Sequence, residues 1–135
     1  QAIAAGLVRS AHDLSDGGLA VAAAECCMAS GLGAHLEIPA SSQRVDRLLF
    51  AEGGARILVS VAPAHTVAWQ EALDAANAAA PGSVPAQCLG VVEDEAELSI
   101  SQAGHRLLQV PVAQLSERFE QAIPRRMGVD LPPTA

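Results

Sequence analysis

The chain has 135 residues, a formal net charge of −7 and no lysine. A chain of this length can form one domain that buries roughly two-thirds of its unfolded surface, enough for a core without disulfide or metal support. The acidic balance, together with only three aromatic residues, argues against nucleic acid and against an anionic membrane surface as partners. Leu, Val, Ile and Ala must therefore supply the core.

Targeting and redox signals are equally sparse. No apolar run approaches ~18 residues and the start does not resemble a signal peptide, so we expect a cytoplasmic protein without a membrane span. Cys26 and Cys27 are neighbours in a helical pattern and point in different directions, which disfavours a shared metal or a disulfide between them. We expect these two and Cys88 to be buried free thiols, with no metal site.

The first half of the chain alternates helical and extended patterns. Residues 18–30 (GLAVAAAECCMAS) are typical of a helix that Gly31 and Gly33 end. Residues 33–40 alternate apolar and polar positions, which predicts a half-buried strand closed by Pro39. A serine cap and a short helix over 45–50 follow.

The most apolar segment is ARILVSVAP, residues 55–63, and it predicts a strand at the centre of its sheet. Residues 64–80 predict a surface helix that ends at Pro81-Gly82. Its buried face is expected to carry Val67 and Leu73, with Trp69 or Ala76 beside them.

Three short strands are expected next, over residues 86–94, 96–102 and 105–111, with hairpin connections at 93–95 and 103–104. An amphipathic helix over 112–123 then begins after Pro111 and ends at Pro124. Its apolar face consists of Val112, Leu115, Phe119 and Ile123.

Together these elements predict an α/β (α+β) fold, a mixed β-sheet with helices on its faces. Residues 1–127 are expected to form a single domain and 128–135 a loose tail. The chain begins with Gln1 and its opening residues read as the middle of a longer protein.

The stretch SAHDLSDGGL, residues 10–19, carries the main candidate site. Ser15 or Asp16 can cap the helix that begins at Gly18. Gly17 and Gly18 weaken that helix but let the backbone approach another group closely. Two interpretations stay open: the loop binds an anion such as phosphate at the helix N-terminus, or the glycines serve a tight turn or close helix packing.

The neighbours of this loop admit the same two kinds of interpretation. His12 and Asp13 flank it and could orient a ligand, or pair with each other. Nothing in the chain supplies a histidine-lysine-carboxylate set for phosphoryl transfer, so no catalytic residue is expected.

Three segments resemble a known family. AHDLSDGGLAVAAAE is similar to the signature of the phosphoribosylformylglycinamidine synthases (formylglycinamide ribonucleotide amidotransferases). These belong to the aminoimidazole ribonucleotide synthetase superfamily. LLFAEGGARILVSV and FEQAIPRRM resemble two further blocks of these enzymes, so that the likeness runs from residue 10 to about 127. The matching positions are His12, Asp13, Ser15, Asp16, Gly17, Gly18, Leu19, Glu25, Glu52 and Arg56.

The resemblance implies a fold like the carboxyl-terminal domain of aminoimidazole ribonucleotide synthetase. It also implies a parent enzyme that uses ATP, Mg²⁺ and glutamine-derived ammonia to convert formylglycinamide ribonucleotide to its amidine. The implied partners are the ATP-binding half of the same chain, a glutaminase subunit and a small accessory subunit. We expect the fragment alone to be inactive and to bind no cofactor firmly. A homodimer of the fragment through its uncovered face is a further partner expectation.

The same resemblance assigns phosphate or nucleotide contact to Ser15–Gly18 and a ligand-orienting role to Glu52 and Arg56. These two can equally form an ordinary ion pair. The first tandem copy in the family carries a Glu-Ser-Gln run where this chain has Glu52 followed by glycine, which argues that this half does not hold the substrate.

Two other function classes remain open at this stage. One is a different ATP-dependent enzyme of the superfamily, similar to selenophosphate synthetase, the hydrogenase-maturation synthetases or thiamine-monophosphate kinase. The other is a non-catalytic binding or scaffold module, in which the glycine loop is only a turn.

Overall fold

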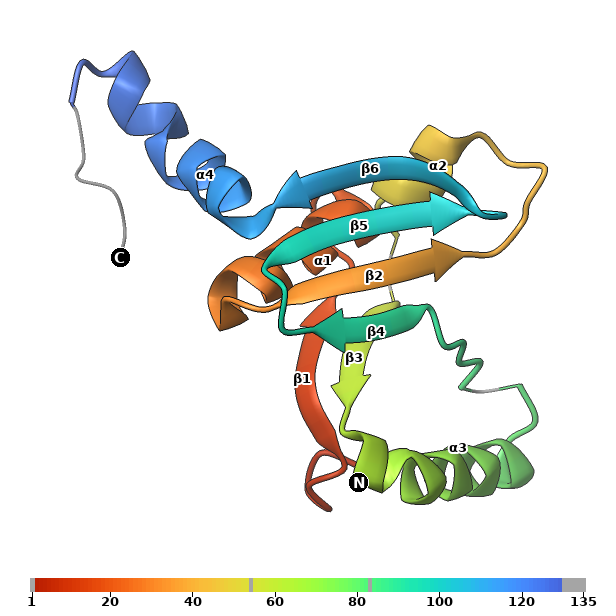
Figure 1. Cartoon of the computed structure of the whole chain (residues 1–135). Helices are drawn as coiled ribbons and strands as arrows, with labels where there is room; N and C mark the ends of the chain where they lie inside the picture. The colour runs from red at the N-terminus through yellow and green to blue at the C-terminus, as the bar shows by residue number, and fades with distance from the viewer. Residues whose placement is uncertain (1, 54, 83, 130–135) are drawn as a thin grey trace.

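The computed structural model of the chain describes residues 2–53, 55–82 and 84–129. Four strands form a mixed sheet in the order β4-β2-β5-β6, and β1 pairs with β3 in a separate two-stranded ribbon (Figure 1). The elements in chain order are β1 (Val8–Asp13), α1 (Gly18–Ser30), β2 (Gly33–Ile38), α2 (Val45–Phe50), β3 (Ile57–Val61), a 3-10 turn (Pro63–His65), α3 (Thr66–Ala79), β4 (Gly90–Glu93), β5 (Glu97–Gln102), β6 (His105–Pro111) and α4 (Val112–Arg126). The predicted mixed α/β fold is confirmed.

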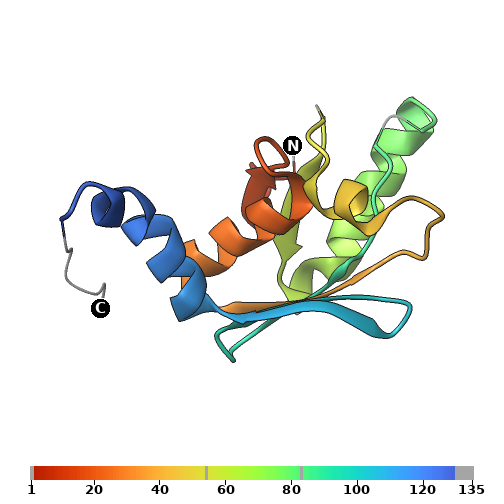
Figure 2. The ribbon, with the colours of Figure 1, turned by 90° about the horizontal axis from the view of Figure 1, so that it is seen from above.

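Helix α1 is the centre of the molecule. Its bounds agree with the prediction, and Gly31 ends it in the left-handed conformation (φ 71°). Figure 2 shows the four-stranded sheet edge-on, with the helices gathered on one side of it. The core between α1 and the sheet is aliphatic, as expected from the composition: Leu14, Leu19, Ala20, Ala22, Ala23, Cys27, Ala34, Leu36, Ile38, Leu49, Leu98, Ile100 and Val112.

The sheet keeps the alternation that the sequence predicts for β2. Alternate residues of β2 are buried toward α1, whereas Glu37 is exposed and His35 lies half-buried on the other face. There the His35 Nδ1 lies 2.8 Å from the Ser99 hydroxyl of β5. Strand β2 runs parallel to β5 and antiparallel to β4, while β5 and β6 form the predicted antiparallel hairpin across residues 103–104.

Two expectations about strand pairing were wrong. The apolar strand β3 is not central. In the part of the chain that the structure describes it pairs only with β1, a strand that the sequence did not predict, and Ile57 at its start is 65% exposed. The connection at residues 93–95 is not a hairpin either, because β4 lies against β2 and the chain then crosses to β5 on the other side of β2.

The ends of two helices and the buried face of a third also differ from the prediction. Helix α2 starts at Val45 as predicted, but Arg44 occupies the capping position and no side chain caps it. Helix α4 continues two residues past Pro124, since proline removes only one backbone donor near a helix end. In α3, Leu73 is buried and Trp69 and Ala76 are half-buried, but Val67 is 72% exposed and does not share their face.

The apolar face of α4 is only partly covered. Val112 is buried and Leu115 packs against the core, but Phe119 and Ile123 are 67% and 69% exposed. Of the predicted tail, the Gly128 and Val129 amides still donate to carbonyls of α4, and residues 130–135 lie outside the described part of the chain. Across the described residues, no helix is both long and apolar enough to cross a membrane.

Candidate functional site

The glycine loop connects the end of β1 to the start of α1. Leu14 is buried and its amide donates to the Arg56 carbonyl at 2.9 Å, which fixes the loop to the strand beside it. Ser15 and Asp16 are exposed. Gly17 and Gly18 both have positive φ angles, 77° and 66°, a conformation that glycine adopts without strain.

Gly18 is needed for packing between two helices. A Cβ atom at this position would lie 2.8 Å from the Ala51 carbonyl oxygen and 3.0 Å from that of Leu49. Both acceptors belong to the backbone at the end of α2, which cannot move aside as a side chain could. The interpretation of the glycines as a site of close helix packing is therefore confirmed at Gly18.

Two of the backbone donors at the start of α1, the amides of Gly17 and Gly18, already have partners. The Gly17 amide donates to Glu52 Oε1 at 3.1 Å, and the Gly18 amide donates to the Ser15 carbonyl at 3.2 Å. The expected cap by the side chain of Ser15 or Asp16 is wrong, because Gly17 is the capping residue and no side chain bonds in that role. The Glu52 carboxylate thus occupies the place that an external anion would take at the Gly17 amide.

His12 and Asp13 do not pair through their side chains. The His12 Nε2 lies 3.1 Å from a Glu25 carboxylate oxygen of α1, and its Nδ1 lies 2.7 Å from the Asp13 carbonyl. The imidazole therefore connects β1 to α1. Of the two interpretations, the structure places His12 in a structural contact and leaves the Asp13 carboxylate at the edge of the loop.

Glu52 and Arg56 do not form the ion pair that the sequence left open. Glu52 accepts from Gly17, whereas the Arg56 guanidinium donates to the Ala51 carbonyl. Among the described residues, the recorded ion pairs include no contact between these two side chains. Arg56 thereby holds the end of α2, and Glu52 holds the start of α1.

A shallow hollow of about 220 Å³ lies in front of the loop. It brings most of the predicted site residues together and adds three that the sequence did not single out, Leu14, Gly53 and Ala55. Ala55 has a φ angle of 65°, a strained value for a residue with a side chain. The lining residues are Asp13, Leu14, Ser15, Asp16, Glu52, Gly53, Ala55 and Arg56.

The charge and size of this hollow limit what it can hold. Three carboxylates face one guanidinium, so a bare phosphate would meet net repulsion. The volume is below the roughly 300–1,000 Å³ of typical small-molecule sites. Within the described residues, no group of three His, Cys, Asp or Glu side chains could hold a metal ion. The hollow by itself therefore does not fit a nucleotide with its Mg²⁺.

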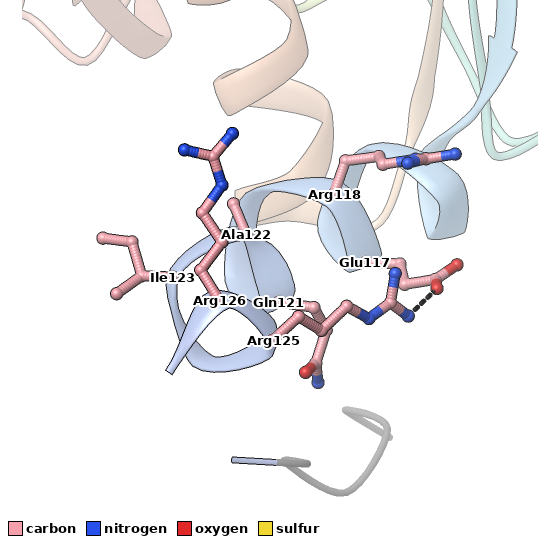
Figure 3. Close-up of a pocket in the computed structure, with 7 residues that line it drawn as sticks. All are labelled: Glu117, Arg118, Gln121, Ala122, Ile123, Arg125 and Arg126. Carbon is pink, nitrogen blue, oxygen red and sulfur yellow. Dashed lines mark hydrogen bonds and ion pairs between the residues drawn. The ribbon is translucent and has the colours of Figure 1, made fainter. Parts of the chain in front are cut away.

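A larger hollow of about 560 Å³ lies along α4, away from the loop. Figure 3 shows that its side chains all come from this one helix and splay outward rather than converge on a common point. Glu117 and Arg125 pair with each other within it. Convergent polar groups are what a ligand site needs, so this surface is not a candidate active site. Its lining residues are Glu117, Arg118, Gln121, Ala122, Ile123, Arg125 and Arg126.

The cysteines are free thiols, but they do not share one environment. Cys27 is buried and Cys26 half-buried, whereas Cys88 is exposed, which corrects the expectation that all three are buried. Burial raises the pKa of both helical thiols, with the nearby Glu25 charge as a second cause at Cys26 and Cys26 itself as the second cause at Cys27. These two are therefore poor nucleophiles.

The fold and the loop together define a class of protein: a mixed α/β domain in which a glycine pair opens the central helix against the end of a second helix. Residues 1–102 match the family model described as AIR synthase related protein, C-terminal domain. The chain belongs to this family.

Its relatives carry a more specific name. The chain is 67% identical over 129 residues to the phosphoribosylformylglycinamidine synthase subunit PurL of Prochlorococcus marinus strain MIT 9303. It is 50% identical over 129 residues to the subunit of the same name from Synechococcus strain WH7803. These matches cover 96% and 95% of the chain but only 16% of each relative, so the chain spans about a sixth of their length.

Solved structures share the fold. Thermotoga maritima PurL, in a structure described as complexed with ATP, superposes with a TM-score of 0.70 at 21% identity and covers 85% of this chain and 20% of that one. A structure of the same protein complexed with FGAR gives the same TM-score and identity, with 19% of that chain covered. Similarity at this level of identity shows the common fold.

Proposed function

We propose that this chain acts as one part of the synthetase subunit of a phosphoribosylformylglycinamidine synthase. The whole enzyme converts formylglycinamide ribonucleotide, ATP and glutamine-derived ammonia into formylglycinamidine ribonucleotide, ADP and phosphate in purine biosynthesis. The observation that carries this proposal is the 67% identity to the Prochlorococcus marinus subunit across 96% of the chain.

The chain contributes structure rather than a catalytic group. ATP supplies the phosphoryl group that makes an amide oxygen a leaving group, and Mg²⁺ neutralises phosphate charge. Here the loop of residues 15–18 forms one wall of a nucleotide site. Asp13, Asp16 and Glu52 line that wall as carboxylates, which suit a cation-bound phosphate and repel a bare one. The small volume of the hollow supports a site that another part of the longer polypeptide completes.

The same proposal gives the chain its surroundings. Its partners are the ATP-binding half of the polypeptide, a glutaminase subunit and a small accessory subunit, in the cytoplasm. The relatives are named as subunits, and one solved neighbour is described as PurLQS from Thermotoga maritima. Residues 1–127 act as one domain, and the buried cluster around α1, which joins residues from Leu14 to Val112, supports this.

A hybrid enzyme tests the proposal. The 129-residue stretch of the MIT 9303 relative that matches this chain is replaced by the chain itself. The hybrid is expected to form the amidine, with release of ADP, within about tenfold of the unmodified relative, and the isolated chain is expected to form none. A hybrid that unfolds at the same temperature as the relative but makes no product would overturn the proposal.

The role of the loop is tested in the same hybrid. Changing Gly17 and Gly18 to Val is expected to weaken nucleotide binding at least tenfold, measured by calorimetry. Gly82→Val is the matched control, because Gly82 has a φ of 71° with no atom within 4 Å of a Cβ and so carries only the backbone strain. If the loop variant binds nucleotide as tightly as the Gly82→Val control does, the loop does not form a wall of the nucleotide site.

A further inference from the structure

An uncovered apolar stripe runs along the second half of α4 and onto Met127, the residue that directly follows the helix. Phe119, Ile123 and Met127, which we call the α4 stripe, are 67%, 69% and 73% exposed. They follow one another at intervals of four residues, so each lies about 40° around the helix from the last. Figures 1 and 2 show this part of α4 projecting away from the sheet.

The α4 stripe continues the face by which α4 packs on the body of the molecule. Val112 is 5% exposed and Leu115 packs against the core, and both lie on the same side of the helix as Phe119. The opposite side carries the exposed Gln114 near the start of the helix and, seven residues later, the buried Gln121. The apolar face of α4 is buried in the first half of the helix and exposed in the second half. An exposed apolar face of this kind indicates an interaction surface.

The length of the relatives indicates what covers it. The chain spans 16% of the 67% identical relative, so more than four-fifths of that polypeptide lies outside the present structure. Residues 119, 123 and 127 fall within the 129 residues of chain that match, or directly at their end. An apolar ridge of this kind recognises another apolar helix or sheet face, which a polypeptide of that length can supply within the same chain.

We propose that the α4 stripe is an intramolecular docking surface, covered by an apolar face of the polypeptide that lies outside these 135 residues. The inference rests on the part of the proposed function that places the chain inside a longer synthetase. It does not depend on which reaction that synthetase performs.

The test compares cysteine reactivity in two settings. Ile123→Cys and Gln114→Cys are introduced separately into the isolated chain and into the hybrid with the MIT 9303 relative. Alkylation rates are read peptide by peptide by mass spectrometry. Nine residues, about two and a half turns, separate the two positions, so Gln114 is the matched control on the opposite side of the same helix.

The cysteine at position 123 is expected to react at least tenfold more slowly in the hybrid than in the isolated chain, and the cysteine at 114 less than threefold more slowly. Equal rates at position 123 in both settings, or equal slowing at both positions, would overturn the proposal. Slow reaction of position 123 in the isolated chain, with a dimer in light scattering, would assign the surface to a second copy and also overturn it. An active hybrid with a freely reactive position 123 would reject this inference while leaving the proposed function intact.

Discussion

Replacement of Gly18 by alanine gives the sharpest test of the glycine loop. Gly18 has a φ of 66°, and its added Cβ would lie 2.8–3.0 Å from three backbone atoms of Leu49, Phe50 and Ala51. The left-handed conformation costs a residue with a side chain ~1 kcal/mol or somewhat more. Forcing a methyl group into a closely packed contact adds about 1–3 kcal/mol. We therefore expect Gly18→Ala to lower the free energy of unfolding by about 2–4 kcal/mol.

Gly31→Ala is the matched control, at the other end of the same helix. Gly31 has a φ of 71°, but no atom lies within 4 Å of its added Cβ, so this variant carries the backbone strain without the contact. Its expected loss is ~1 kcal/mol. The difference between the two variants measures the close approach of α1 to the end of α2.

Urea denaturation of the isolated chain, followed by circular dichroism, gives both free energies, and thermal unfolding checks them. A change of 1 kcal/mol corresponds to roughly 3–4 °C for a domain of this size. Gly18→Ala is then expected to unfold about 6–16 °C below the parent, and Gly31→Ala about 3–4 °C below it. Equal losses in the two variants would refute the assignment of Gly18 to helix packing.

Four further expectations follow from the same structure. Gly17→Ala is expected to lower the free energy of unfolding by about 2 kcal/mol, because the added Cβ would lie 2.4 Å from Val21 Cγ2. In a double-mutant cycle, Val21→Ala is expected to relieve part of that loss. Additive losses in the two variants would contradict this contact. Glu52→Gln is expected to lower the free energy of unfolding by about 0.3–1 kcal/mol in urea denaturation, because it removes a negative charge from the N-terminus of α1. Glu71→Gln, at an exposed position within α3, is the control and is expected to cause no loss. Arg125 lowers the pKa of Glu117 below 4.5 by hydrogen bonding and charge. The pair therefore contributes stability above that pH, and the contribution is lost as the pH falls through the lowered pKa. Glu117→Gln should lower the unfolding temperature slightly at about pH 7 and not at about pH 2, and the opposite pH dependence would exclude the pair. In native alkylation followed by mass spectrometry, Cys88 is expected to react first, Cys26 more slowly and Cys27 last, an order set by exposure and by the raised pKa of the helical thiols; early reaction of Cys27 would show that α1 opens readily.

Local patterns predicted the elements that local chemistry determines. Helix α1 runs from Gly18 to Ser30 because alanine-rich sequence favours it, and Gly31 supplies the left-handed residue that ends it. Strand β2 shows the predicted alternation because one of its faces packs on α1. In both cases the signal lies within about a dozen consecutive residues.

Pairing between distant segments could not be predicted in this way. Strand β2 runs parallel to β5, so that Ala34 lies opposite Leu98 across more than sixty residues of sequence. The short strand β4 reads as half of a hairpin because only three residues separate it from β5, but β2 lies between them. The apolar run at β3 suggested a central strand, whereas its half-buried residues pair only with β1.

The sequence singled out Gly17, Gly18, Glu52 and Arg56 through a motif and a resemblance, and their role in binding stays a prediction. In the structure Gly17 bonds Glu52, Gly18 packs against the end of α2, and Glu52 and Arg56 line the hollow. The sequence could not show that Glu52 accepts from Gly17, because 35 residues separate them. Nor could it show that Arg56 donates to a carbonyl rather than to Glu52.

These connections determine how the loop can act on a ligand. The helix N-terminus at Gly17 has the positive partial charge that attracts anions, and the chain satisfies it with the Glu52 carboxylate. An anion that bonds the Gly17 amide therefore has to displace that carboxylate. Glu52 comes two residues after the end of α2, and Gly18 packs against the backbone at the same end. The hydrogen bond at Gly17 and the close packing at Gly18 thus both join the start of α1 to the end of α2.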